Sequence, residues 1–158
     1  MQANAISGDN AQVGVFRGGS AKLITLAMKG QDKKIHLFDT FSGMPYVNEA
    51  IDLHRVGDFK DTSLEAVKNL FSDISYAKFY PGRFPETSLP VQNNRFAFVY
   101  IDADIYQSVL DALMFFYPRM PKGGIMVFDD FMGKNTPGVK KALDEFLKGK
   151  LELPIITT

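Results

Sequence analysis

Phe96-Ala-Phe-Val-Tyr-Ile-Asp-Ala-Asp104 carries a short apolar run directly into a pair of aspartates. The run Ile125–Phe128 ends in the same way, in Asp129-Asp130, and the run Ile35–Phe38 ends in Asp39. Short apolar runs of this kind are typical of strands that are buried on both faces of a parallel sheet. In open α/β sheets, ligands bind outside the carboxyl ends of such strands. The sequence therefore predicts an α/β fold with a group of carboxylates at the edge where a ligand binds.

Strand-like and helix-like segments alternate along the rest of the chain, which is the pattern of βαβ units. The sequence predicts strands at 11–16, 34–39, 76–80, 95–101 and 125–128, with the tail 151–158 as a candidate sixth strand. It predicts helices at 20–29 with Ser20 as N-cap, at 62–72 with capping-box spacing of Thr62 and Glu65, at 106–117, and from Thr136-Pro137 onward. We expect a single domain over residues 1–158, with a Rossmann-like, doubly wound, mostly parallel sheet and helices on both faces.

Composition and charge limit the classes of function. The 158 residues include 18 Lys plus Arg and 18 Asp plus Glu, so no net charge favours nucleic acid or an anionic membrane surface. The absence of cysteine excludes disulfides, thiolate zinc sites and cysteine nucleophiles. No segment approaches the roughly 18 consecutive apolar residues of a membrane span, and the first residues lack the features of a signal peptide. We expect a cytoplasmic protein that acts on a small molecule, without a nucleic-acid or membrane partner.

The segment Gly14-Val-Phe-Arg-Gly-Gly-Ser20 lies between the first predicted strand and helix, where a ligand-binding turn belongs. It matches neither the dinucleotide fingerprint nor a phosphate-binding P-loop. A glycine at a strand end lets the backbone approach a ligand closely, and the helix N-terminus beyond it favours a carboxylate. Asp39 ends the neighbouring strand 25 positions after Gly14, near the usual distance for an acid that accepts ribose hydroxyls. An adenosine with an amino-acid tail fits this set. The alternative is a tight Gly18-Gly19 turn, with Asp39 capping the loop that follows it.

Asp102, Asp129 and Asp130 are candidate oxygen ligands of one divalent cation. Crowded acids resist ionising unless a cation or a set of donors compensates them. Mg²⁺ typically takes one or two carboxylates and keeps several waters, while Ca²⁺ takes more oxygens. The structural alternative is that Asp104 caps the helix beginning near Tyr106 and that Asp130 accepts hydrogen bonds from loop amides.

Residues 40–60 form a polar stretch without clear periodicity, which is typical of a functional or a disordered loop. His54 lies in this stretch and is a candidate general base near neutral pH, with a merely solvated histidine as the alternative. His36, inside a predicted strand, is expected to face a polar side or a neighbour.

Taken together, these motifs resemble the class I S-adenosylmethionine-dependent methyltransferases. Within that class the chain resembles the macrocin O-methyltransferase family, whose characterised members methylate sugar hydroxyls of antibiotics with Mg²⁺. The matching stretches run in the family's order: 13–20, Leu37–Pro45, Tyr80–Thr87, Tyr100–Ser108 and Gly123–Asp130.

The resemblance implies that the Gly14 turn holds the methionine part of S-adenosylmethionine, that Asp39 binds ribose, and that residues 82–84 lie near the adenine. The cofactor-binding residues that it implies are Gly14, Val15, Phe16, Arg17, Gly18, Ser20, Asp39, Thr40, Gly82, Arg83, Phe84 and Asp102. Asp102, Asp129 and Asp130 fall on the family's metal positions, and His54 lies in the region of a family histidine.

The reaction that we expect is Mg²⁺-dependent transfer of the methyl group of S-adenosylmethionine to a hydroxyl oxygen of a small molecule, such as a sugar of a glycosylated metabolite. Asp102 or His54 would accept the proton. Two other functions stay open: a non-catalytic or partner-dependent S-adenosylmethionine-binding module, and a Mg²⁺-dependent phosphohydrolase.

Three departures from the family pattern accompany this expectation. Gln12 stands where the family usually has Glu, which would weaken a buried hydrogen bond near the cofactor turn. We also expect the helical N-terminal segment that covers the active site, and a last strand, to be missing. A minimal form, a fragment, or a chain that relies on a partner or a homo-oligomer for its lid would fit.

Overall fold

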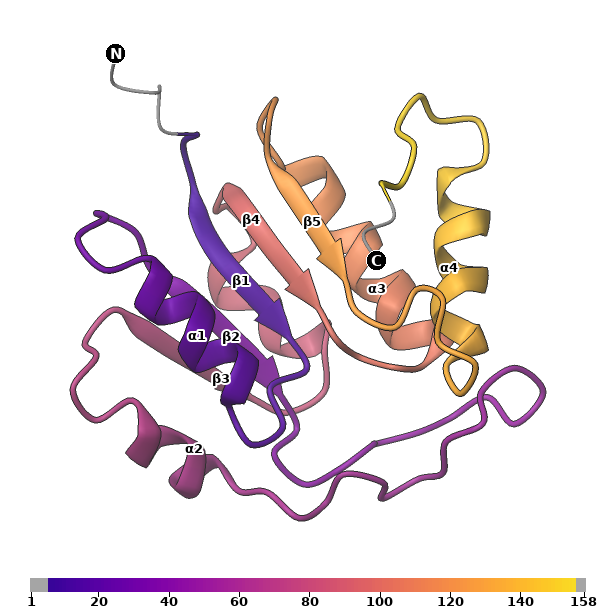
Figure 1. The fold of residues 1–158 in the computed structure, drawn as a ribbon, viewed down its shortest axis with the longest axis horizontal. Helices are drawn as coiled ribbons and strands as arrows, with labels where there is room; N and C mark the ends of the chain where they lie inside the picture. The colour runs from indigo at the N-terminus through magenta and orange to yellow at the C-terminus, as the bar shows by residue number, and fades with distance from the viewer. Residues whose placement is uncertain (1–5, 156–158) are drawn as a thin grey trace.

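The computed structural model describes residues 6–155. Five parallel strands form one sheet in the order β3-β2-β1-β4-β5 (Figure 1). The elements in chain order are β1 (Asp9–Val13), α1 (Gly19–Ala27), β2 (Ile35–Asp39), α2 (Leu64–Leu70), β3 (Ala77–Pro81), the 3₁₀ helix η1 (Glu86–Val91), β4 (Phe96–Ile101), α3 (Tyr106–Phe116), the 3₁₀ helix η2 (Tyr117–Arg119), β5 (Ile125–Phe128) and α4 (Pro137–Leu147). This order confirms the doubly wound α/β fold that the sequence predicts.

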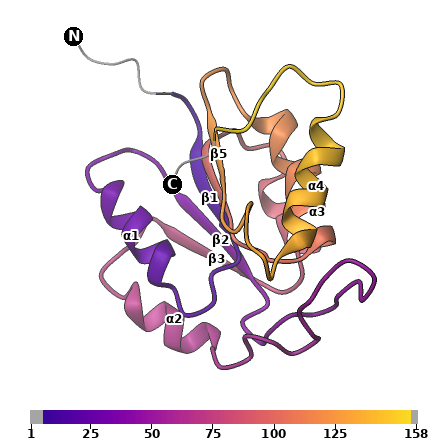
Figure 2. The same cartoon turned by 45° about the vertical axis from the view of Figure 1, so that its right-hand side comes forward.

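The winding of the sheet reverses between β1 and β4. From β1 the chain adds β2 and β3 on one side, and β4 and β5 then extend the sheet on the other. Helices α1 and α2 cover one face, while α3 and α4 cover the other (Figure 2). Such a reversal is a topological switch point, and the crevice outside it is where open α/β sheets bind ligands.

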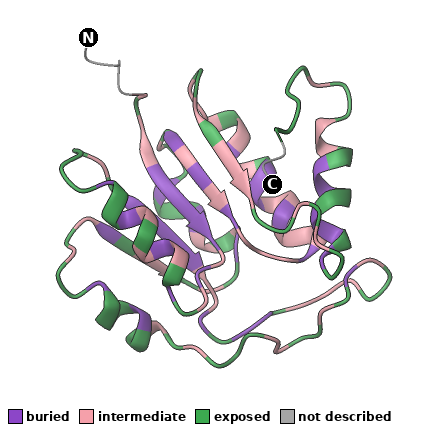
Figure 3. Cartoon of the chain, in the orientation of Figure 1, coloured by how far each residue is buried: buried purple, intermediate pink, exposed green. Residues whose placement is uncertain are grey.

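Each face of the sheet has its own hydrophobic core. The core beneath α3 and α4 contains Phe38, Phe96 and Phe116, and the core beneath α1 and α2 contains Ile35 and Leu37; all five side chains are fully buried. Figure 3 shows that β1 and β2 are buried over most of their length, whereas the edge strand β5 is exposed or half-buried. The ends of the central strands are therefore held firmly by packing on both sides.

The first strand differs from its predicted range of 11–16, because it runs from Asp9 to Val13. The chain turns away from the sheet at Gly14, whose φ of 82° lies in the left-handed region. The next two backbone amides donate hydrogen bonds to the carboxylate of Asp39 instead of extending the strand. The apolar Val15-Phe16 pair thus belongs to the turn. The predicted range is wrong at both ends, because it includes residues 14–16 of the turn and omits Asp9 and Asn10 of the strand.

Two predicted helix caps are also wrong. Gly18 is the N-cap residue of α1, and the hydroxyl of Ser20 accepts a hydrogen bond from the side chain of Gln12 instead. The side chain of Ser63 caps α2, while Thr62 donates its hydroxyl to a carbonyl oxygen of the turn before α1. Both hydroxyls bond outside the span of a capping pattern: Ser20 to Gln12, eight positions away, and Thr62 to Phe16, 46 positions away.

The other predicted elements lie within one or two residues of the observed ones, and residues 40–60 contain no helix or strand. The candidate sixth strand is wrong for residues 151–155, which lack strand pairing and expose Leu151, Leu153 and Ile155 almost completely. Residues 156–158 of that candidate lie outside the described part of the chain. Within residues 6–155, no helix combines the length and the apolar composition that a membrane-spanning helix needs.

Candidate active site

A cleft of about 270 Å³ opens at the carboxyl edge of the sheet, outside β1, β2 and β4. Eight of the residues that the resemblance assigns to the cofactor line this cleft: Gly14, Phe16, Asp39, Thr40, Gly82, Arg83, Phe84 and Asp102. Four do not line it: Val15, Arg17, Gly18 and Ser20. Val15 is buried in the core beneath α1, and Arg17 is exposed and paired with Asp61. The cleft therefore contains most, but not all, of the predicted cofactor-binding residues.

Gly14 is required by the protein's own packing. A Cβ atom at this position would lie 1.8 Å from the backbone oxygen of Asp102, and the positive φ adds strain for any other residue. The close contact brings the turn after β1 directly against the residue that follows β4. The glycine thus explains how the two strand ends meet, and this contact requires it whether or not a ligand binds.

Asp39 organises the turn around the cleft. Its Oδ2 atom accepts hydrogen bonds from the backbone nitrogens of Val15 at 2.7 Å and Phe16 at 2.9 Å, and its Oδ1 atom accepts one from Phe41 at 2.6 Å. The Phe41 bond is the loop cap that the alternative interpretation predicts. A carboxylate has about four acceptor positions, so one remains for a ligand hydroxyl. Asp39 therefore has a structural role and still faces the cleft.

Gln12 supports the same turn from below. Its fully buried side chain donates from Nε2 to the backbone oxygen of Gly14 at 2.7 Å and to Oγ of Ser20 at 2.9 Å. A carboxylate at this position would accept hydrogen bonds only and could not donate to the carbonyl oxygen. The amide of Gln12 therefore donates a hydrogen bond to Gly14 that a glutamate carboxylate could not donate.

The segment after β3 closes one side of the cleft. Gly82 has a φ of 127°, and Phe84 is buried against Phe38 and Phe116, with a stacked ring of Phe116 at 5.6 Å. The guanidinium group of Arg83 lies 5.2 Å from the ring centre of Tyr46, which comes from the long 40–60 loop. A flat ring of a ligand could therefore pack against the apolar wall that Phe84 forms, close to the guanidinium group of Arg83.

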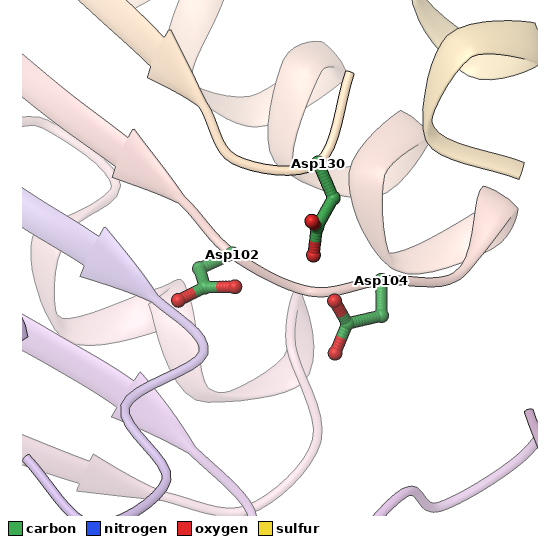
Figure 4. A group of neighbouring side chains, drawn as sticks. All are labelled: Asp102, Asp104 and Asp130. Atoms are coloured by element: carbon green, nitrogen blue, oxygen red, sulfur yellow. The ribbon is translucent and has the colours of Figure 1, made fainter. Parts of the chain in front are cut away.

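Three carboxylates converge at the other side of the cleft. Asp102, Asp104 and Asp130 each offer an oxygen atom, and these atoms all lie within 4.8 Å of one another (Figure 4). Asp104 and Asp130 have φ values of 57° and 54°, in the left-handed region that few side chains adopt. The structure thus brings together two of the three predicted metal ligands. Asp129 is not in the group; its carboxylate lies beside the hydroxyl of Tyr100.

The pKa values of these aspartates report their crowding. Burial, followed by the charges of Asp104, Asp129 and Asp130, raises the pKa of Asp102 to about 7. Burial and a hydrogen bond with Asp130 raise the pKa of Asp104 as well. A divalent cation would favour the ionised form of each group. The donor set, three oxygens from carboxylates that repel one another, therefore fits a hard divalent cation such as Mg²⁺.

His54 lies in the 40–60 loop and does not line the cleft. Its Nδ1 atom is 3.3 Å from Oδ2 of Asp58, and its ring centre is 5.4 Å from that of Phe59. A positive charge on His54 would lower the pKa of Asp104, against the effect of burial. His36, in contrast, is buried on β2, between Asp9 and Tyr80.

One residue of this region differs from what the sequence suggests, and another was missed by it. Asp104 does not cap α3. The N-cap residue of this helix is Ile105, whose side chain makes no capping hydrogen bond. The backbone nitrogen of Tyr106 instead donates to Asp52 in the 40–60 loop. The Asp-x-Asp spacing after a buried strand is the one local pattern that indicates Asp104 as a member of the acidic group. No local pattern indicates Asp52.

Comparisons with known proteins bear on the family and the fold of the chain. The sequence profile of the Macrocin-O-methyltransferase (TylF) family matches residues 1–157. The chain is 30% identical over 157 residues to the demethyldecarbamoylnovobiocin O-methyltransferase of Streptomyces niveus, covering 90% of this chain and 59% of that protein. It is 29% identical over 159 residues to the mycinamicin III 3''-O-methyltransferase of Micromonospora griseorubida, covering 90% of this chain and 61% of that protein.

Among solved structures, the O-methyltransferase NovP superposes with a TM-score of 0.82 at 31% identity, over 98% of this chain and 69% of that one. The calicheamicin methyltransferase CalS11 shares the fold, with a TM-score of 0.75 at 21% identity over 89% of this chain and 64% of that one. The chain spans a little under two thirds of the length of the curated relatives that it matches. On the profile match over nearly its whole length, the chain belongs to the macrocin O-methyltransferase family.

Proposed function

We propose that this chain is the catalytic domain of an S-adenosylmethionine-dependent O-methyltransferase, which moves a methyl group to a hydroxyl oxygen of a small molecule with the help of Mg²⁺. The observation that carries the proposal is that one cleft combines the Gly14 turn, Asp39 and a group of three aspartates. Membership of the macrocin O-methyltransferase family supports it.

The S-adenosylmethionine end of the cleft would lie between the turn after β1 and the segment after β3. The free acceptor position of Asp39 suits a ribose hydroxyl, and the apolar wall of Phe84 with Arg83 suits an adenine ring. The Gly14 turn would face the amino-acid part. Val15, Arg17, Gly18 and Ser20 would then act indirectly, by holding the shape of the turn, since they do not line the cleft.

Asp102 and Asp130 would hold the cation. The observed geometry favours Asp104 as the third ligand, whereas the sequence resemblance implies Asp129. When bound, S-adenosylmethionine supplies an electrophilic methyl group, and Mg²⁺ supplies positive charge that lowers the pKa of an acceptor hydroxyl. The protein's own contribution is to fix the acceptor oxygen opposite the sulfur, because orientation alone gives a large part of such a rate increase.

Asp102 is the better placed proton acceptor of the two candidates. It lines the cleft and adjoins both the Gly14 turn and the acidic group, whereas His54 does not line the cleft. The acceptor hydroxyl would lose its proton to Asp102 as the carbon–oxygen bond forms and S-adenosylhomocysteine is released. His54, held by Asp58, would then keep the acidic side of the cleft electrostatically balanced.

We propose a sugar hydroxyl of a glycosylated natural product as the acceptor class. The support is that three relatives at about 30% identity are named as O-methyltransferases of novobiocin, tetracenomycin and mycinamicin compounds. A cytoplasmic location and a homo-oligomer remain predictions of the sequence.

The test is methyl transfer from S-adenosylmethionine with a labelled methyl group, in the presence of Mg²⁺, to demethyldecarbamoylnovobiocin and to mycinamicin III. We expect label in at least one acceptor, and a loss of about 100-fold or more in Asp102→Asn. Exposed Asp144→Asn is the control and should keep full activity. Cofactor binding without transfer to any hydroxyl acceptor would point to the binding module, and phosphate release without cofactor binding would point to the phosphohydrolase.

A further inference from the structure

The start of α3 has no cap from its own neighbourhood. The first four amides of a helix lack partners within the helix and need other acceptors. The N-cap residue Ile105 is apolar and makes no side-chain cap. The backbone nitrogen of Tyr106 instead donates at 2.8 Å to Oδ1 of Asp52, which is 54 positions earlier in the sequence. A residue of the long 40–60 loop therefore supplies the cap.

The carboxylate of Asp52 also forms a hydrogen bond within its own loop. Its Oδ2 atom accepts from the backbone nitrogen of Asn48 at 2.9 Å, and the backbone oxygen of Asn48 accepts from the nitrogens of Ile51 and Asp52. The side chain is 5% exposed, and no ion pair between described residues includes it. Backbone amides and the positive end of α3 are thus the groups that compensate its charge.

Helix α4 packs directly against this contact. A Cβ atom on Gly138, in the first turn of α4, would lie 2.3 Å from Oδ1 of Asp52 and 2.6 Å from the nitrogen of Tyr106. Only glycine leaves room for the hydrogen bond at that point. Three segments that are distant in the sequence therefore meet at one buried carboxylate.

The hydrogen bond between Asp52 and Tyr106 lies next to the acidic side of the cleft. Asp104 lies two residues before Tyr106, and its φ of 57° is unfavourable unless the surroundings fix it. On the other side of the contact, Met44 and Pro45 form a wall of the cleft, and His54 follows Asp52 by two residues. The Asp52–Tyr106 bond joins the wall of the 40–60 loop to the turn that directs Asp104.

We propose that Asp52 is a positioning residue, which fixes Asp104 and the 40–60 loop in the arrangement that binds the divalent cation. The inference rests on the proposed cation site. It assigns to Asp52 no contact with the cation, with S-adenosylmethionine or with the acceptor.

The experiment compares wild type, Asp52→Ala, Asp52→Asn and the exposed control Asp144→Asn. Mn²⁺ is the metal probe, with its dissociation constant read from the electron paramagnetic resonance of free Mn²⁺. S-adenosylhomocysteine binding in EDTA and amide hydrogen exchange of residues 44–58 and 105–109 are measured on the same samples.

In Asp52→Ala we expect faster exchange in both segments, Mn²⁺ binding about tenfold weaker, and S-adenosylhomocysteine binding within about threefold of wild type. In Asp52→Asn the amide oxygen still accepts from Tyr106, but the NH₂ group cannot accept from Asn48. We therefore expect a partial rescue, with Mn²⁺ binding about threefold weaker than wild type. If Asp52→Ala does not fold, this intermediate loss in Asp52→Asn carries the test.

Wild-type affinity for Mn²⁺ in the variants that fold would overturn the inference, because Asp52 would then be a structural cap only. Equal losses of Mn²⁺ and S-adenosylhomocysteine affinity would also overturn it. A wild-type protein that binds neither probe would instead contradict the proposed function, so the two failures are distinguishable.

Discussion

The Oδ2 atom of Asp39 lies 2.7 Å from the backbone nitrogen of Val15, so the acid at the end of β2 holds the turn that follows β1. Phe16 donates to the same oxygen atom. The residue that the sequence marks as a candidate ribose ligand is therefore also the residue that shapes the turn after β1. On the proposed function, cofactor affinity and the stability of the turn would depend on the same carboxylate.

Replacing this carboxylate should affect both properties. In Asp39→Asn an NH₂ group faces backbone donors at one side of the side chain, so charge-assisted hydrogen bonds are lost. We expect the free energy of unfolding to fall by about 1–3 kcal/mol and S-adenosylhomocysteine to bind at least about tenfold more weakly. Urea unfolding and calorimetry measure the two effects. The exposed Asp61→Asn is the matched control, with a change below about 1 kcal/mol.

Gly14→Ala separates backbone strain from steric conflict. Both Gly14 and Gly149 have positive φ values, of 82° and 80°, but only Gly14 has another backbone within reach of a Cβ atom. Gly149→Ala should cost about 1 kcal/mol of the free energy of unfolding, from strain alone. Gly14→Ala should cost about 3 kcal/mol or more, because the contact with Asp102 adds to the strain. Similar losses in both variants would contradict the close contact of the two strand ends.

The aspartates can be assigned one by one through Mn²⁺ affinity. We expect Asp102→Asn and Asp130→Asn each to weaken Mn²⁺ binding by at least about tenfold, because each would remove one of a few charged ligands. On the observed geometry Asp104→Asn should do the same. A loss in Asp129→Asn with none in Asp104→Asn would instead support the ligand set that the sequence predicts.

His36 gives the free energy of unfolding a defined pH dependence. Burial on β2 lowers the pKa of this histidine below its ordinary 6.5, although the hydrogen bond with Asp9 opposes the shift. The unfolded chain therefore takes up a proton at higher pH than the folded chain. The stabilisation is complete above about pH 6.5 and is lost as the pH falls through the window between 6.5 and the lowered value.

Urea unfolding of wild type and His36→Gln at several pH values between about 7.5 and 5 measures this effect. Wild type should lose more of its free energy of unfolding than the variant as the pH falls over this range, because only wild type carries the histidine whose pKa burial lowers. The raised pKa values of Asp102 and Asp104 act with the opposite sign, but they are present in both proteins and cancel in the comparison. Burial alone would raise the pKa of Asp9, but its hydrogen bonds with His36 and Lys34 bring it below the ordinary value of 3.8. Asp9 therefore titrates outside this pH window. Parallel pH profiles would contradict a buried, neutral His36.

The parts of the fold and site that the sequence predicts are those with local causes. An apolar run followed by an aspartate marks a buried strand and its carboxyl end, so β2, β4 and β5 and the positions of Asp39 and Asp102 are accessible without coordinates. Periodicity likewise gives the helices to within two residues.

The parts that escape prediction depend on contacts across the chain. Ser20 has the character of a cap but bonds to Gln12, and the cap of α3 comes from Asp52 in a different loop. The inclusion of Asp104 in the acidic group, and the exclusion of Asp129 from it, depend on side-chain directions. The positive φ of Asp104 sets one of these directions, and nothing in its neighbours' sequence predicts that angle.

Calorimetric titration with S-adenosylhomocysteine, once with Mg²⁺ and once with EDTA, tests the central claim most directly. The account predicts binding of one molecule per chain under both conditions, since the Gly14 turn, Asp39 and the Phe84 wall need no cation. It also predicts that Asp39→Asn weakens binding while Asp61→Asn does not. An absence of binding under both conditions, in a protein that unfolds cooperatively, would contradict the assignment of this cleft to S-adenosylmethionine.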